Sequence, residues 1–213
     1  VTRTRIKICG LTRPDDVVAA VAAGVDALGF NCYPGSSRYL PLARLGALAP
    51  LVGPMVTPVL LFVNGTEAEV RTALAVVPNA VLQFHGDETA EFCRSFGRPY
   101  WRAVPGDDRS RLLDCFALHA SAQAILVDTP SAGRGGSGRT FDWSVIPAPA
   151  ERPVPVVLAG GLHAGNVGAA IRDARPAAVD VSSGVESAPG IKDAGKMAQF
   201  VAAVRAADVS LTS

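Results

Sequence analysis

The feature that most constrains this chain is a regular alternation of short apolar runs with helix-like segments along its whole length. Eight runs are predicted to be strands: residues 6–9, 27–30, 56–63, 80–84, 100–104, 124–127, 156–159 and 179–181. These runs are apolar at successive positions rather than at alternate ones, which is typical of parallel strands buried on both faces. Parallel neighbours need a crossover connection, which is usually a helix.

Helix signals fill the intervals between these strands. Thr12 with Asp15 and Thr66 with Glu69 have capping-box spacing, and Gly24 is placed to end the first helix. The remaining helices are predicted over residues 42–51, 88–96, 109–120, 166–174 and 191–207, with a brief helical segment at 143–146. Each predicted strand is therefore followed by a helix or a helical turn.

This alternation favours an α/β fold in which a single (β/α)8 barrel domain spans residues 1–213. No linker or change of composition divides the chain. At 213 residues the barrel has to be compact, since about 250 residues are typical of that fold. An open, doubly wound sheet is the structural alternative, because the alternation does not itself prove closure.

Composition narrows the class of protein. Hydrophobic residues make up 49% and charged residues 18% of the chain, as in ordinary globular proteins. A formal charge of +1 with no basic run predicts neither a nucleic-acid partner nor a membrane partner. No signal peptide is visible, no apolar run reaches the ~18 residues of a membrane helix, and the cysteines show no paired spacing. We therefore expect a cytoplasmic protein with free thiols.

No metal site is expected, because the three histidines are scattered and the cysteines lack ligand spacing. In a (β/α)8 barrel the active site lies at the C-terminal ends of the strands. Two neighbouring strand ends carry candidate phosphate-binding turns, formed by Gly160 and Gly161 and by Ser182, Ser183 and Gly184. Glycine permits close approach of a ligand to the backbone, and a short helix beginning at the serines would face an anion. Either turn could instead be glycine-rich for conformational reasons alone.

Two further strand ends carry groups that can move protons. Cys9 ends the first predicted strand and Asp128 follows the sixth, so the two lie on opposite sides of the barrel mouth. That arrangement suits an isomerisation by general acid–base catalysis, provided that a nearby helix N-terminus or cation lowers the pKa of the thiol. The alternatives are a buried structural thiol and an aspartate that caps a turn.

Three more side chains are placed near the mouth. Arg38, in the loop after the second strand, is a candidate to pair with a substrate carboxylate or phosphate, although a solvated surface arginine is the simpler interpretation. Gln83 and His85 share one side of the fourth strand, and His85 is either a pocket residue or a hydrogen-bonded core residue. The glycine-rich segment 133–143 lacks the ending of a P-loop and is more consistent with a loop that closes over substrate.

Several motifs occur together in the order found in one enzyme family. They are KICGLT (7–12), Ser-Ser-Arg (36–38), LFVN (61–64), LQFHGDE (82–88), LVDT (126–129), GGSGRTFDW (135–143), LAGGL (158–162) and DVSSGVESAPGIKD (180–193). In this combination, which extends over essentially the whole chain, the sequence resembles the phosphoribosylanthranilate isomerases of tryptophan biosynthesis.

The resemblance implies a role for each candidate. Cys9 is expected to be the general base, Asp128 the general acid and Arg38 the partner of the anthranilate carboxylate, in an Amadori rearrangement of a phosphorylated small molecule. It implies no cofactor and no metal, because the substrate's own iminium accepts the electrons, and it leaves monomer and homodimer open. The chain departs from the family at Ser37, where proline is usual, so the loop loses a φ constraint.

Two other enzyme functions and one binding function are the alternatives. An indole-glycerol-phosphate synthase would call for a catalytic lysine near a strand end, but Lys7 lies within the first strand and Lys192 and Lys196 lie in the last helical region. The histidine-pathway isomerase would be expected to have aspartate at the position of Cys9. A catalytically silent sugar-phosphate-binding paralogue would have no need of the acid–base pair.

Overall fold

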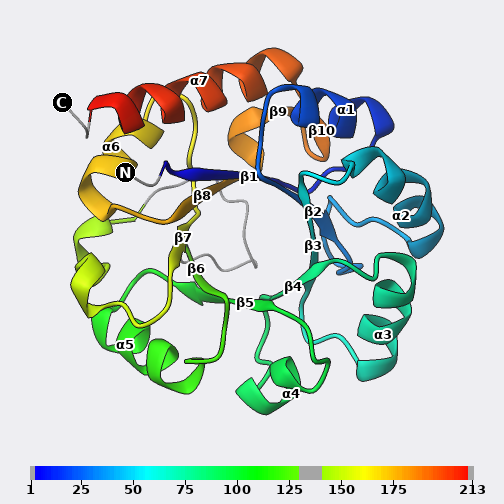
Figure 1. Cartoon of the computed structure of the whole chain (residues 1–213), viewed down its shortest axis with the longest axis horizontal. Helices are drawn as coiled ribbons and strands as arrows, with labels where there is room; N and C mark the ends of the chain where they lie inside the picture. Colours follow the sequence, from blue (N-terminus) through cyan, green and yellow to red (C-terminus); the bar gives the residue numbers. More distant parts are fainter. Residues whose placement is uncertain (1–2, 130–140, 211–213) are drawn as a thin grey trace.

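Eight parallel strands close into a barrel in the order of the sequence. The computed structural model describes residues 3–129 and 141–210. The strands are β1 (Arg5–Cys9), β2 (Ala27–Asn31), β3 (Thr57–Phe62), β4 (Val81–Phe84), β5 (Tyr100–Pro105), β6 (Ala124–Asp128), β7 (Val156–Leu158) and β8 (Ala178–Val181). Strand β8 pairs with β1, which closes the ring seen in Figure 1. The (β/α)8 prediction is thus confirmed and the open sheet is excluded.

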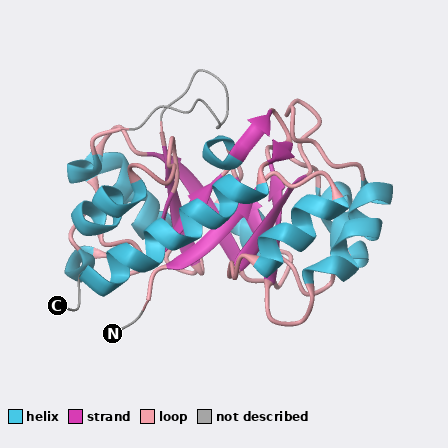
Figure 2. Ribbon diagram, turned by 90° about the horizontal axis from the view of Figure 1, so that it is seen from above, coloured by secondary structure: helices cyan, strands magenta, loops and turns pink. Residues whose placement is uncertain are grey.

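Helices cover the outside of this ring. The described ranges contain α1 (Pro14–Ala22), α2 (Leu42–Leu48), α3 (Glu67–Val76), α4 (Ala90–Arg94), α5 (Arg109–Leu118), α6 (Val167–Ala174) and α7 (Ala194–Ser210). Short 3-10 helices follow α2, β6 and β8: η1 (Ala49–Val52), η2 (Trp143–Val145), η3 (Pro149–Glu151) and η4 (Ser183–Val185). Figure 2 shows the strands in the middle of the molecule with helices on both sides. No helix within the described ranges combines the length and the apolar character needed to cross a membrane.

The pleat of β1 directs alternate side chains to opposite faces of the barrel wall. Ile6 and Ile8 belong to the large apolar cluster between strands and helices, whereas Lys7 and Cys9 point to the other face, inside the ring. One cluster inside the ring contains the small residues Ala103, Ala124, Ala159 and Ala178 together with Leu126 and Val157. Because Cys9 is the last residue of β1 and points inward, it lies at the C-terminal mouth of the barrel.

The last predicted helix begins later than expected. Ile191–Lys192 is not helical; it forms strand β10, which pairs antiparallel with β9 (Glu186–Ala188). A helix start at residue 191 was therefore wrong. The chain turns at Gly190 with φ +78°, and the carboxylate of Asp193 accepts a hydrogen bond of 2.9 Å from the Lys196 N–H, so the helix begins only after this cap.

Of the two predicted capping boxes, one is confirmed and one is wrong. Thr66 and Glu69 form a capping box at α3. Thr12 does not cap α1, because its hydroxyl donates a 2.6 Å hydrogen bond to Gly190 O and the N-cap residue is Arg13. Gly24 lies just beyond α1 with φ +81°, the left-handed backbone conformation in which helices commonly end.

Other helices are shorter than predicted. The predicted helix 42–51 is divided into α2 and η1, where Pro50 stands at the first turn of the 3-10 helix. The predicted helix 88–96 is reduced to Ala90–Arg94, because the Thr89 hydroxyl accepts a hydrogen bond from the Phe92 N–H and so begins the helix there.

Candidate active site

A cavity of about 90 Å³ lies at the C-terminal ends of the strands and collects nearly all of the predicted site residues. Those that line it are Cys9, Arg38, Gln83, His85, Asp128, Gly160, Gly161, Ser182 and Ser183. Gly184 does not line it. A Cβ on Gly184 would overlap the carbonyl oxygen of Leu162, so this glycine lets η4 pack against the segment after β7.

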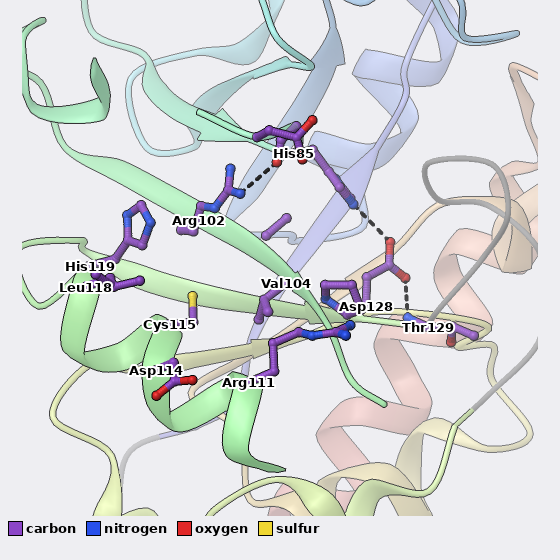
Figure 3. A pocket seen from close by; sticks show the side chains of 14 residues that line it. His85, Arg102, Val104, Arg111, Asp114, Cys115, Leu118, His119, Asp128 and Thr129 are labelled. Carbon is purple, nitrogen blue, oxygen red and sulfur yellow. Dashed lines mark hydrogen bonds and ion pairs between the residues drawn. The ribbon is translucent and has the colours of Figure 1, made fainter. Parts of the chain in front are cut away.

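Asp128 carries a partly buried carboxyl group that lines the cavity. It ends β6, where its Oδ1 accepts a 2.7 Å hydrogen bond from the Thr129 N–H. Its Oδ2 lies 3.5 Å from His85 Nε2, and Figure 3 shows the two side chains directed toward each other. Burial raises the pKa of Asp128 to about 6, although the Thr129 hydrogen bond opposes the shift. A carboxyl with this pKa keeps a protonated fraction near neutral pH.

Cys9 faces Asp128 from the opposite side of the ring. Burial raises the pKa of the Cys9 thiol, and the Lys7 ammonium opposes the shift. The net direction of the pKa shift is therefore upward, and the nearby cation Lys7 acts against it. Helix α1 begins only at Pro14, five residues after Cys9, and the Thr12 hydroxyl donates to Gly190 O.

Arg38 does not extend into solvent. Its Nε donates a hydrogen bond to Glu186 Oε1 and its Nη2 donates one to Glu186 Oε2, both at 2.7 Å. The arginine side chain crosses directly over Gly10, where a Cβ would overlap its Cδ, and Gly10 has φ +79°. The glycine after Cys9 is thus required both by the turn and by the path of Arg38.

Glu186 also fixes a second cation. Lys192 Nζ donates hydrogen bonds to Glu186 Oε1 at 2.8 Å and to Ser182 O at 3.1 Å. The Ser182 hydroxyl in turn donates to Cys9 O at 3.0 Å. Arg38 and the β1 end are therefore joined through one buried polar chain that runs over the β9–β10 hairpin.

The two predicted phosphate-binding turns lie side by side in this cavity. Gly160 and Gly161 have φ of +87° and +61°, and a Cβ on Gly160 would overlap Thr129 Oγ1. The predicted short helix after β8 is present as η4, which begins at Ser183. The Asn166 side chain donates a 3.0 Å hydrogen bond to Gly161 O and holds the first turn in place.

Four charged residues of this region were not predicted: Lys7, Asp180, Glu186 and Lys192. Lys7 was assigned only to a strand and Lys192 only to a helix. One signal was available for Lys7, since it stands two residues before Cys9 and must share its face of β1. Nothing in the sequence pairs Arg38 with Glu186, because 148 positions separate them.

A second pocket of about 400 Å³ shares His85 and Asp128 with the first and extends between β5 and α5 (Figure 3). Arg102 is held there by hydrogen bonds to Glu88 Oε2 at 2.9 Å and Gly86 O at 2.6 Å. Within the described part of the chain, no group of three or more potential metal-ligating His, Cys, Asp or Glu residues occurs. The proposed closing segment 133–143 lies largely outside the described residues, which exclude 130–140.

Comparison with known proteins agrees with this geometry. The family model of N-(5'-phosphoribosyl)anthranilate isomerase matches residues 6–203. The isomerase of Leptothrix cholodnii is 55% identical over 206 residues, which are 97% of this chain and 93% of the relative.

Solved structures give the same result. Two structures of the isomerase from Thermotoga maritima have TM-scores of 0.88 and 0.82 at 35% identity, each covering 95% of this chain and 99% of the other. The second is of monomers generated from the dimeric enzyme. A phosphoribosylanthranilate isomerase in complex with reduced 1-(o-carboxyphenylamino)-1-deoxyribulose 5-phosphate has a TM-score of 0.84 at 33% identity, with the same coverage. The chain described here therefore belongs to the N-(5'-phosphoribosyl)anthranilate isomerase family.

Proposed function

We propose that this chain converts N-(5'-phosphoribosyl)anthranilate to 1-(2-carboxyphenylamino)-1-deoxyribulose 5-phosphate in tryptophan biosynthesis, with Cys9 as general base and Asp128 as general acid. One observation carries the assignment of roles. The two groups enter the same cavity from opposite strands, and Asp128 has a pKa raised to about 6 by burial. A substrate between them can be protonated on one side and deprotonated on the other.

The reaction then proceeds as a balanced isomerisation. Asp128 gives its proton to the furanose ring oxygen as the bond from that oxygen to C1' breaks, which leaves an iminium at C1'. The Cys9 thiolate removes the proton from C2', and the electron pair of that C–H bond neutralises the iminium to give an enolamine. Protonation at C1' with loss of the hydroxyl proton at C2' yields the ketone. The iminium accepts electrons within the substrate, and the residues only move protons.

The remaining site residues are assigned to binding. Gly160, Gly161, Ser182 and Ser183 bind the phosphate at the two turns, with Gly184 allowing these turns to pack together. Arg38 binds the anthranilate carboxylate through Nη1, since no described residue accepts a hydrogen bond from that atom. Gln83 and His85 contact the sugar between these ends. The Oε1 of Gln83 is buried and has no hydrogen-bond partner among the described residues, which supports this assignment.

We also propose that residues 1–213 act as one barrel domain, in the cytoplasm, as a monomer or a homodimer. The continuous ring from β1 to β8 supports a single domain. The dimeric state of the Thermotoga enzyme supports the homodimer.

The assignment is tested by following the loss of substrate fluorescence for the wild type, Cys9→Ser and Asp128→Asn. Both variants should lose about 10²–10⁴ in turnover, as expected for a proton-transfer group, while circular dichroism stays unchanged. Cys32→Ser and Asp15→Asn are matched controls away from this acid–base pair and should keep their turnover. Unchanged turnover in Cys9→Ser or Asp128→Asn would remove that residue from its role, and an inactive wild type would favour a silent binding protein.

A further inference from the structure

One buried charge in the barrel has no role in the mechanism above. Lys7 is 1% exposed and its Nζ lies 2.9 Å from Asp180 Oδ2. The ammonium also lies 5.9 Å from the centre of the Trp101 ring. A buried ion is costly unless it is paired, so a lysine at this position requires a reason beyond filling space.

Lys7 and Cys9 are neighbours on the inner face of β1. They are two residues apart, and Cys9 pairs in register with Gly29 of β2. A Cβ built on Gly29 would lie 2.7 Å from Cys9 Sγ and 3.1 Å from Lys7 Cε. The thiol and the lysine side chain therefore lie against the same bare stretch of β2, and no side chain of Gly29 separates them.

Asp180 completes the cluster from the other neighbouring strand. It pairs in register with Lys7 across β8, and its Oδ1 has no hydrogen-bond partner among the described residues. Asp180 lines the same cavity as Cys9. One carboxylate oxygen holds the ammonium in place, and the negative charge of the group opposes ionisation of the nearby thiol.

Other charged groups face Cys9 from the remaining sides. Lys192 approaches from β10 and Arg38 from the loop after β2, each fixed by Glu186. Asp128 and His85 face it across the mouth of the barrel. Lys7 is the cation nearest to Cys9 in sequence, and Lys192 and Arg38 are both bound to the opposing charge of Glu186.

We propose that Lys7 is a positioning residue that stabilises the thiolate of Cys9, and that the negative charge of Asp180 opposes this stabilisation. The inference rests on the proposed role of Cys9 as base and supplies the cation which that role needs. The pKa directions agree with it. Burial raises the pKa of Cys9, Lys7 lowers it and Asp180 raises it. Burial by itself lowers the pKa of Lys7, but Asp180 and Cys9 reverse this, so the lysine stays charged.

The test measures thiol reactivity without turnover. Wild type, Lys7→Met and Asp180→Asn are treated with iodoacetamide at several pH values, and alkylation of the Cys9 peptide is followed by mass spectrometry. Loss of the ammonium should raise the pKa of the Cys9 thiol and so leave about tenfold less thiolate at a given pH. Because a more basic thiolate is also more nucleophilic, alkylation below the midpoint should slow by about three- to fourfold.

Asp180→Asn should have the opposite effect. It keeps the shape of the side chain and an oxygen for the Lys7 ammonium but removes the opposing charge. The thiolate of Cys9 also favours the charged form of Lys7, so the ammonium is retained when Cys9 ionises and alkylation should become about three- to fourfold faster. A purely structural role would not produce opposite signs in two members of one ion pair. Lys7→Arg should restore most of the wild-type rate, and Lys196→Met, which removes an exposed lysine, should leave it unchanged.

Folding is controlled within the same experiment. Cys93 is completely buried, so its alkylation reports opening of the barrel in any variant. If Lys7→Met does not fold, Asp180→Asn still decides, because unchanged or slower alkylation of Cys9 there overturns the inference. In a folded Lys7→Met, an unchanged rate overturns it as well. Loss of turnover in Cys9→Ser concerns the proposed base and is read separately from these rates.

Discussion

Replacing Glu186 by glutamine tests how Arg38 is prepared for substrate. The carboxylate accepts two hydrogen bonds of 2.7 Å from Arg38 and one of 2.8 Å from Lys192. The two side chains of the arginine pair are 14% and 6% exposed, so solvent screens them only weakly. Glutamine keeps one acceptor oxygen and turns an N–H donor toward the arginine, and so removes at least one charged hydrogen bond.

The structure gives the size of the effect. A hydrogen bond to a charged group contributes about 1.5–3 kcal/mol, and the lower end applies because glutamine keeps one acceptor oxygen. If that energy holds Arg38 in its binding position, Glu186→Gln should raise KM by about tenfold, since each 1.4 kcal/mol corresponds to a factor of ten. The turnover number should change little, because the carboxylate end of the substrate is bound equally in ground state and transition state.

Steady-state fluorescence kinetics on four proteins complete this test: wild type, Glu186→Gln, Arg38→Ala and the double variant. If Glu186 acts through Arg38, the second substitution should add nothing to KM once Arg38 is gone. Glu151→Gln is the matched control, because Glu151 pairs with Arg109 on the surface at 2.6 Å. An unchanged or lower KM in Glu186→Gln would refute the reasoning and mark Glu186 as a competitor of the substrate carboxylate.

Three further outcomes are expected. The productive form needs protonated Asp128 and ionised Cys9. The pKa of Asp128 is about 6, whereas burial raises the pKa of the Cys9 thiol above its ordinary value. Because the acid has the lower pKa, the fraction of enzyme in the productive form rises with pH up to about 6 and is then constant until Cys9 ionises. Measured from pH 5 to 9, kcat/KM should follow this fraction. A fall in kcat/KM between pH 6 and 8 would contradict the assignment. Gly160→Ala should destabilise the fold by about 1–3 kcal/mol, since φ is +87° and the new Cβ would lie 2.5 Å from Thr129 N. An unchanged thermal midpoint would contradict this conformation of the turn. Arg152→Ala should lower the free energy of unfolding by about 1–2 kcal/mol, measured by urea denaturation, with activity retained. The Arg152 guanidinium donates hydrogen bonds to Ala174 O at 2.6 Å and to Arg175 O at 2.9 Å at the end of α6. No loss of stability would show that water satisfies these carbonyls equally well.

Much of the fold was readable from local pattern. The first strand was predicted over 6–9 and occurs as Arg5–Cys9, and Thr66 with Glu69 forms the predicted capping box. These features depend on residues close in sequence, which a single chain displays directly. The error at 191–192 has the opposite origin, since β10 exists through its pairing with β9 and through Lys192 contacts to Ser182 and Glu186.

Most of the candidate site was also predictable, for a geometric reason. Parallel strands in a barrel bring all of their C-terminal ends to one mouth, so residues at those ends converge whatever their distance in sequence. Gly184 is the exception, because whether a glycine faces a ligand or a neighbouring backbone depends on the packing of two loops. Glu186 was not predicted because its contact with Arg38 depends on the β9–β10 hairpin, which no local sequence pattern predicts.

By itself, the sequence determined the barrel and the chemical groups at its mouth, because alternating apolar runs and residue order are local properties. Only the tertiary structure decided how those groups ionise. The thiol of Cys9 lies beside a lysine on its own strand, but the aspartate that holds that lysine is 173 positions away. Asp128 has its raised pKa because the closed ring buries it. Proton affinity depends on desolvation and on nearby charge, and both are set by distant segments brought together in the fold.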